Sequence, residues 1–271
     1  MKRIFVLLLL ALSWASPAWA AYGHIRPVTI DHTKVPTSDQ TNFPVLFSGT
    51  YSYLATVANG GLVTSASGYD IIFTSDAACA TKLDHEIEIY TATSGLVVFW
   101  VRVPTVATAT DTVIYLCYGD SGVTTSQQNI TGVWDSNFKG VWHLPNGTTL
   151  TALDSTSNAN NGTISGPTAT AGQVDGGGIW GAASTDKITT GLTTHNSTRT
   201  YELWTYRTGA GGNSLGRLFD KRTAGAQVEI LYNDNANATY DYLVSWNGVA
   251  DQGTWRITAP SASAWHHIVV T

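Results

Sequence analysis

The sequence predicts an all-β protein. Short apolar and aromatic segments recur along the chain, and clusters of Gly, Asn, Ser and Thr divide them at short intervals. Segments with the 3.6-residue period of a helix are scarce. Charged residues make up only 12% of the chain. Many short strands separated by turn residues are typical of sandwiches and jelly rolls, so we expect two such domains in tandem.

Residues 1–20 have the pattern of a Sec-type signal peptide. The basic Lys2 and Arg3 precede an apolar run, and the sequence AWA at 18–20 has the small-x-small form of a cleavage site. The apolar run is too short to cross a bilayer, which takes about 20 residues. We therefore expect a secreted protein, extracellular or periplasmic, with no membrane span in the mature chain.

The charge balance excludes one class of partner. The chain has a net charge of −5, and removal of Lys2 and Arg3 would make it more negative. It has no basic stripe, which argues against nucleic acids and anionic membrane surfaces as partners.

Residues 21–120 are expected to form a β-sandwich domain. Strand-like segments in it alternate with turn clusters, and the polar, turn-rich stretch 121–132 that follows is the predicted linker. The six predicted strands are 24–31, 43–49, 69–75, 83–90, 96–103 and 111–118.

Residues 133–271 are expected to form a second β-domain. Its first strand is separated from the next by a long polar region, 145–178, and loops of this length usually bind ligands or cross the surface. The predicted strands are 138–144, 186–191, 200–207, 226–233, 240–246, 253–258 and 265–271.

The first domain resembles a known family. The segments RPVTIDHT, FPVLFSGTY, YDIIFTSD, TKLDHEIEIY, VVFWVRVPT and TVIYLCYGD resemble, in this order, the secreted bacterial family called domain of unknown function 2341. The resemblance covers about residues 22–120. It implies an all-β extracellular module with no established chemistry.

The second domain resembles laminin-G-like jelly rolls of the concanavalin A superfamily. GVWHLPNGT, LDSTSNANNGTISG, RTYELWTYR and WHHIVVT carry the resemblance. In that family further strands follow the W-H-H strand, so the resemblance implies that the jelly roll at 133–271 is incomplete, truncated at its C-terminal end. The final segment, 265–271, is apolar on both faces and would need neighbours that the sequence does not supply.

An acidic triplet lies in the predicted strand 83–90. Asp84, Glu86 and Glu88 alternate with apolar positions, which places them on one face of the strand. They resemble the catalytic strand of concanavalin A-like glucanases, in which two carboxylates would act as nucleophile and acid/base. A cation site is another interpretation. We favour a solvated sheet face without catalytic residues, because the triplet lies outside the jelly roll and begins with the shorter Asp.

The loop DSTSNANN is a candidate calcium site. The resemblance implies Ca²⁺ at this rim of the jelly roll, with Asp154, Asn158 and Asn160 supplying oxygen ligands. The loop has a single carboxylate, so further ligands would be needed. The alternative is an Asx-rich turn held by its own hydrogen bonds.

Most tryptophans lie in apolar strands and are expected in cores. Trp180, in a Gly-rich turn, and Trp255 are the exceptions, and we expect them to contact ligand. His143 lies in the apolar segment 138–144 and is expected to be a hydrogen-bonded structural residue. Cys79 and Cys117 either form a disulfide, which export permits, or remain free thiols.

These patterns predict a secreted, non-catalytic binding or adhesion protein. Its partner would be a glycan or a cell-surface or extracellular protein, bound through the jelly-roll loops. One alternative is a glycoside hydrolase that uses Asp84, Glu86 and Glu88. Another is a structural stalk of a surface or phage assembly.

Overall fold

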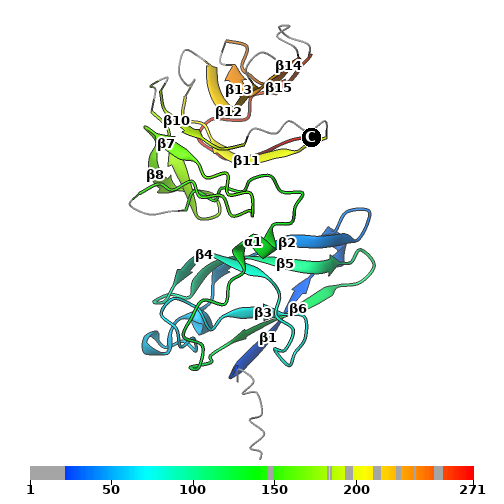
Figure 1. The fold of residues 1–271 in the computed structure, drawn as a ribbon, viewed down its shortest axis with the longest axis vertical. Helices are drawn as coiled ribbons and strands as arrows, with labels where there is room; N and C mark the ends of the chain where they lie inside the picture. The colour runs from blue at the N-terminus through cyan, green and yellow to red at the C-terminus, as the bar shows by residue number, and fades with distance from the viewer. Residues whose placement is uncertain are drawn as a thin grey trace, which may run out of the picture.

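A computed structural model shows a nearly all-β protein arranged in several sheets, as predicted (Figure 1). The expected signal peptide, 1–20, lies outside the described residues. None of the described helices is long and apolar enough to cross a membrane. The structure describes residues 22–145, 149–181, 183, 185–192, 198–209, 215–223, 227–234, 236–246 and 253–271.

The first half of the protein forms two antiparallel three-stranded sheets. One sheet has the order β1-β6-β3 and the other the order β2-β5-β4. Short 3-10 helices η1 (His32–Lys34), η2 (Ser52–Leu54) and η3 (Val57–Asn59) fill the connections. The strands are β1 (His24–Ile30), β2 (Gln40–Thr50), β3 (Ile72–Thr74), β4 (His85–Thr91), β5 (Leu96–Val106) and β6 (Thr112–Tyr118).

The two sheets bury one apolar core between them. Phe73 of β3, Phe99 of β5 and Leu116 of β6 are fully buried in it. The rings of Phe73 and Phe99 meet edge to face with their centroids 5.6 Å apart. Burial of each such residue contributes about 1.5–3 kcal/mol, because its apolar surface leaves water. This core fixes the positions of the two sheets, and with them the positions of the residues on the outer face of the sandwich.

The predicted linker lies along the edge of β4. The backbone N–H of Asn129 donates to the carbonyl of His85 (3.1 Å), and the side-chain oxygen of Gln128 accepts the N–H of Ile87 (2.6 Å). Gln128 and Asn129, near the end of the predicted linker 121–132, therefore pair with two outward backbone groups of β4. The short helix α1 (Ile130–Val133) follows, and Figure 1 shows it against the sheet of β2, β5 and β4.

The second half of the protein is built from antiparallel ribbons and a four-stranded meander, β12-β13-β14-β15. β11 and β16 form a ribbon of their own, and Ile268 of β16 packs with Leu231 and Tyr240 of the meander. Two smaller ribbons pair β7 with β10 and β8 with β9. The strands are β7 (Thr163–Ser165), β8 (Thr168–Ala171), β9 (Gly176–Ile179), β10 (Lys187–Thr189), β11 (Tyr201–Tyr206), β12 (Leu215–Thr223), β13 (Gln227–Asp234), β14 (Thr239–Trp246), β15 (Gly253–Thr258) and β16 (Trp265–Val270).

Two predictions about this region were wrong. The segment 138–144 is not a strand, because its backbone bonds to a loop: Val141 donates to the Asp154 carboxylate and accepts from the N–H of Ser155. The predicted loop 145–178 in turn contains β7, β8 and most of β9.

Candidate functional site

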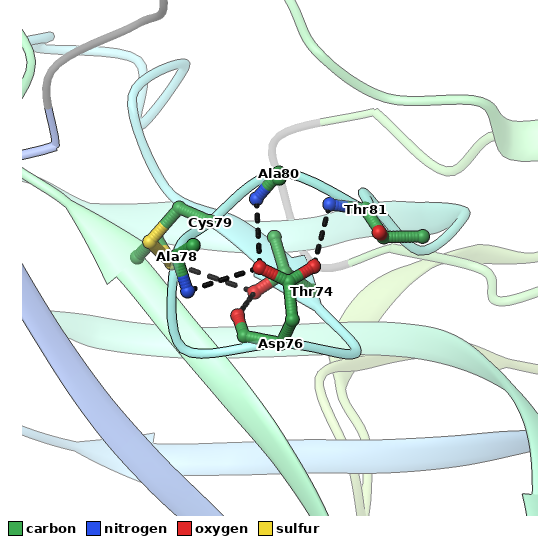
Figure 2. The surroundings of a disulfide bond; sticks show 7 residues. Thr74, Asp76, Ala78, Cys79, Ala80 and Thr81 are labelled. Carbon is green, nitrogen blue, oxygen red and sulfur yellow. Dashed lines mark hydrogen bonds between the residues drawn. A yellow bond between two sulfur atoms is a disulfide. The ribbon is translucent and has the colours of Figure 1, made fainter.

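Cys79 and Cys117 form a disulfide (Figure 2). It ties the loop after β3 to β6, the central strand of its sheet. The Asp76 carboxylate organises this loop by accepting the N–H groups of Ala78 (2.9 Å), Ala80 (3.1 Å) and Thr81 (2.7 Å). These backbone hydrogen bonds hold the pKa of Asp76 below its ordinary value. Of the two alternatives for the cysteines, the structure shows the bonded one.

The acidic triplet does not form a solvated face. The side chain of Glu86 is only 8% exposed and that of Glu88 only 3%, so this part of the favoured interpretation was wrong. Asp84 is separate from them, because its carboxylate accepts from the Asn129 side chain (2.8 Å) and lies 4.0 Å from Arg102. Asp84 therefore does not share a site with Glu86 and Glu88.

A β-bulge interrupts the regular alternation of β4 at Glu88. The pairing of β4 with β5 shifts between Ile87 and Ile89, so Glu88 is the extra residue. Ile87 packs against the core before the bulge, and Tyr90 does so after it. Without the extra residue, strict alternation would have placed Ile89 on the core face instead of Tyr90. Glu86 and Glu88, two residues apart, point to the same outer face and both contact one partner there.

That partner is His143, which lies between the two carboxylates. Its Nε2 is 3.2 Å from Glu86 Oε2, and its Nδ1 is 3.2 Å from Glu88 Oε2. His143 is hydrogen-bonded, as predicted, although the segment that carries it is not a strand. The sequence gives no local sign of this contact, because 55 or more residues separate His143 from both partners.

Two tryptophans complete the cluster. Trp134 Nε1 donates to Glu86 (2.8 Å) and Trp100 Nε1 donates to Glu88 (2.7 Å). Their rings also lie against the ring of His143, with centroid distances of 5.6 Å for Trp134 and 5.7 Å for the stacked Trp100. We call Glu86, Glu88, Trp100, Trp134 and His143 the carboxylate–histidine cluster.

The electrostatics of the cluster follow from burial and charge. Burial lowers the pKa of His143, but the hydrogen bond to Glu86 and the charges of both glutamates outweigh it, so the pKa is raised. Burial raises the pKa of Glu88, and the contacts with His143 and Trp100 do not reverse this. Burial acts likewise on Glu86, but hydrogen bonds from His143, Ser155 and Trp134 bring its pKa below the ordinary value.

Glycoside hydrolysis needs a carboxylate that can reach a sugar. Both oxygens of Glu86 are occupied within the protein, Oε1 by the Ser155 hydroxyl (2.6 Å) and Oε2 by Trp134 and His143. The geometry of these residues therefore favours a structural role.

The candidate calcium loop is a hydrogen-bonded turn. Asp154 Oδ1 accepts the N–H groups of Val141 (3.0 Å) and Thr156 (2.9 Å), while Oδ2 accepts the N–H of Asn160 (2.8 Å) and the Thr156 hydroxyl (2.9 Å). Asn158 donates through its side-chain amide to the carbonyl of Phe138 (3.0 Å). These bonds match the Asx-rich alternative. Calcium at Asp154, Asn158 and Asn160 stays a prediction.

A different group has ligand spacing. Within the part of the protein that the structure describes, Asp31, His32 and Asp111 each place one ligand atom within 4.8 Å of the others. The pairing of β1 with β6, which sets Ile30 opposite Thr112, brings these distant residues together. His32 Nδ1 lies within hydrogen-bond distance of the Asp111 carboxylate (2.6 Å), so the existing contact between these exposed side chains explains the grouping.

The predicted ligand-contacting tryptophans lie at the surface. Trp180 is 46% exposed and Trp255 is 62% exposed, with the ring of Tyr242 5.8 Å from that of Trp255. Trp204 was expected in a core, but it is 45% exposed. The sequence does carry a signal for this exposure, because Glu202 lies two positions earlier and alternation places it on the same face as Trp204.

Trp204 belongs to a group of rings on one face of its ribbon, in which Trp204, Tyr206 and His267 are exposed and Trp265 is half-buried. In the ribbon of β11 and β16, Trp204 lies opposite His267 and Tyr206 lies opposite Trp265. The centroid distances are 4.8 Å for the first pair, which is stacked, and 5.4 Å for the second. Glu202 extends this group, because its carboxylate lies 2.8 Å from His267 Nε2. We call Trp204, Tyr206, Trp265 and His267 the aromatic strip.

Comparison with known proteins supports the first resemblance. Residues 67–143 match the family described as Domain of unknown function (DUF2341). The match runs past the predicted domain boundary at 120 and contains the whole carboxylate–histidine cluster. No curated protein and no solved structure matches the sequence. The resemblance of 133–271 to laminin-G-like domains stays a prediction.

Proposed function

We propose that this is an exported, non-catalytic binding protein that holds carbohydrate on the exposed aromatic side chains of its second half. The observation that carries the proposal is the aromatic strip. An exposed apolar patch of this kind marks binding surfaces, because leaving it in water costs free energy that a ligand can recover.

The chemistry of the strip suits a sugar. The apolar C–H faces of a pyranose pack on indole and phenol rings, which combine a large apolar area with a polar edge. The carboxylate of Glu202 and the imidazole of His267 offer hydrogen-bond partners for hydroxyl groups beside those rings. Trp180 and Trp255 add two further exposed rings in the same half of the protein.

Two features support the exported location. A disulfide persists in oxidising compartments and is rare in the cytosol. The resemblance of the first half to a secreted bacterial family points to the same location.

Binding to insoluble cellulose, chitin and xylan tests this function, with Trp204→Ala, Trp180→Ala and Trp255→Ala compared with the parent protein. We expect Trp204→Ala to weaken binding to the preferred polysaccharide by roughly two- to tenfold, the worth of one ring contact. Phe43→Ala is the matched control, since Phe43 is equally exposed but lies in the first sandwich. Failure of the parent protein to bind any glycan, soluble or insoluble, would refute carbohydrate binding and favour a protein partner or a stalk.

A further inference from the structure

The contact between His143 and the two glutamates requires a proton. A neutral imidazole has one N–H donor and one acceptor nitrogen, whereas the imidazolium has two donors. Both ring nitrogens of His143 face carboxylate oxygens, each at 3.2 Å. Beside an ionised Glu88, a neutral ring that donates from Nε2 to Glu86 would turn its Nδ1 lone pair toward the second carboxylate. The protonated ring avoids this repulsion, so the geometry favours it whenever Glu88 is ionised.

Burial makes the loss of that proton costly. The side chains of His143, Glu86 and Glu88 are 12%, 8% and 3% exposed. Removing one partner of a buried ion pair leaves an uncompensated charge, which water does not reach to stabilise. Here deprotonation of His143 would leave two buried carboxylates close together on the same strand. The adjacent rings of Trp100 and Trp134 also favour a cation over a neutral ring.

Among the residues that the structure describes, the charged groups that act on His143 all have the same sign. Glu86 and Glu88 come from β4, and Asp175, between β8 and β9, acts on His143 through its charge. The remaining neighbours, Trp100 on β5 and Trp134 after α1, carry no charge. Each acidic neighbour favours the imidazolium, so no group in this set opposes the proton.

Glu86 is the point at which the following segment attaches. It accepts hydrogen bonds from Trp134, His143 and Ser155, three residues of the segment 133–155. This segment leads from the first sandwich to β7. Contacts at one carboxylate thus anchor the connection between the two halves of the protein.

We propose that Glu86, His143 and Glu88 form a pH-dependent latch that holds residues 133–145 and 149–155 on the outer face of the first sandwich and releases them as the pH rises. The raised pKa of His143 sets the direction. Its stabilising contribution is complete below the ordinary value of 6.5 and is lost as the pH rises through the higher folded value. The raised pKa of Glu88 acts with the same sign, because the folded state binds that proton more tightly.

Hydrogen exchange of the full-length, disulfide-bonded protein between pH 5.5 and pH 9 tests the latch. After correction for intrinsic rates, we expect the protection of amides in 133–145 and 149–155 to fall by about tenfold for each unit that the folded pKa of His143 exceeds its ordinary value. Amides of β2 and β5 should keep their protection. Unchanged protection of 133–145 and 149–155 over this range would overturn the proposal.

Two variants and one spectroscopic measurement complete the test. His143→Gln should shift the midpoint of the pH step and reduce its size, because only the contribution of Glu88 remains, while His32→Gln, which breaks an exposed contact with Asp111, should keep the step unchanged. A step of unchanged midpoint and size in His143→Gln would overturn the latch. If His143→Gln does not fold, NMR titration of the His143 ring in the parent protein decides: a pKa above 6.5 with both nitrogens protonated supports the proposal, and a pKa at or below 6.5 overturns it.

Discussion

The indole N–H of Trp134 donates to Glu86 Oε2 across 2.8 Å, although 48 residues separate the two side chains. This bond joins the end of α1 to β4. Both groups are buried, so the bond has no competition from water. A mutation at either position therefore affects the connection between the two halves of the protein as well as the first sandwich.

Glu86→Ala should destabilise the first sandwich and the segment docked on it. The change leaves Trp134, Ser155 and His143 without their common acceptor, and breaking a buried ion pair from one side costs about 3–5 kcal/mol. Urea unfolding at pH 6 measures the loss. Glu202→Gln, which removes an exposed pair with His267, should cost less than about 1 kcal/mol. Equal losses in the two variants would show that the carboxylate–histidine cluster contributes no more than a surface contact.

Removal of the disulfide should lower stability without changing the fold. Cys79 and Cys117 are 38 residues apart, and closing a loop of this length stabilises a protein by about 3–4 kcal/mol through the unfolded state. Urea unfolding of the double variant Cys79→Ala/Cys117→Ala should show this loss. Reductant should then lower the stability of the parent protein and leave the variant unaffected.

Asp76→Ala should loosen the loop that carries Cys79. The amides of Ala78, Ala80 and Thr81 lose their acceptor, so their hydrogen exchange should accelerate. The disulfide should also be reduced faster by an added thiol, because access to sulfur limits exchange. The lowered pKa of Asp76 means that the parent loop keeps its stability above the ordinary value of 3.8 and loses it as the pH falls through the lower folded value. Asp39→Asn, at another exposed acceptor, is the control.

Asp154→Ala should lower the melting temperature to the same extent in calcium and in EDTA. Four donors from the protein occupy the Asp154 carboxylate, and their loss does not depend on a metal ion. Thermal unfolding under both conditions measures the effect. If calcium raises the melting temperature of the parent protein and not of the variant, the loop is the calcium site that the laminin-G-like resemblance implies.

The sequence predicts the first sandwich well because each of its strands is an apolar segment bounded by turn residues. Its predicted segments overlap β1 to β6, and β1 is predicted to within one residue. The segment 138–144 has the same apolar composition, yet its backbone pairs with the loop at Asp154 and Ser155. An apolar composition indicates that a segment will be buried. Whether that segment forms a strand depends on whether it pairs with another strand in the folded protein.

The site was less predictable than the fold. The alternation of Asp84, Glu86 and Glu88 is visible in the sequence, but the bulge at Glu88 is not, since it depends on the register with β5. The burial of Glu86 and Glu88 depends on His143 and Trp134, which no local pattern connects to them. The exposure of Trp204 differs, because Glu202 on the same face of the strand indicates it.

The contacts of Gln128 and Asn129 with β4 affect how copies of this protein can assemble. A free strand edge can recruit a strand from another molecule and so start a fibril, and here the connecting segment occupies that position on β4. The opposite border of the same sheet is β2, where Pro44 lacks the amide that an incoming strand would need. At both borders, growth of this sheet from molecule to molecule is disfavoured.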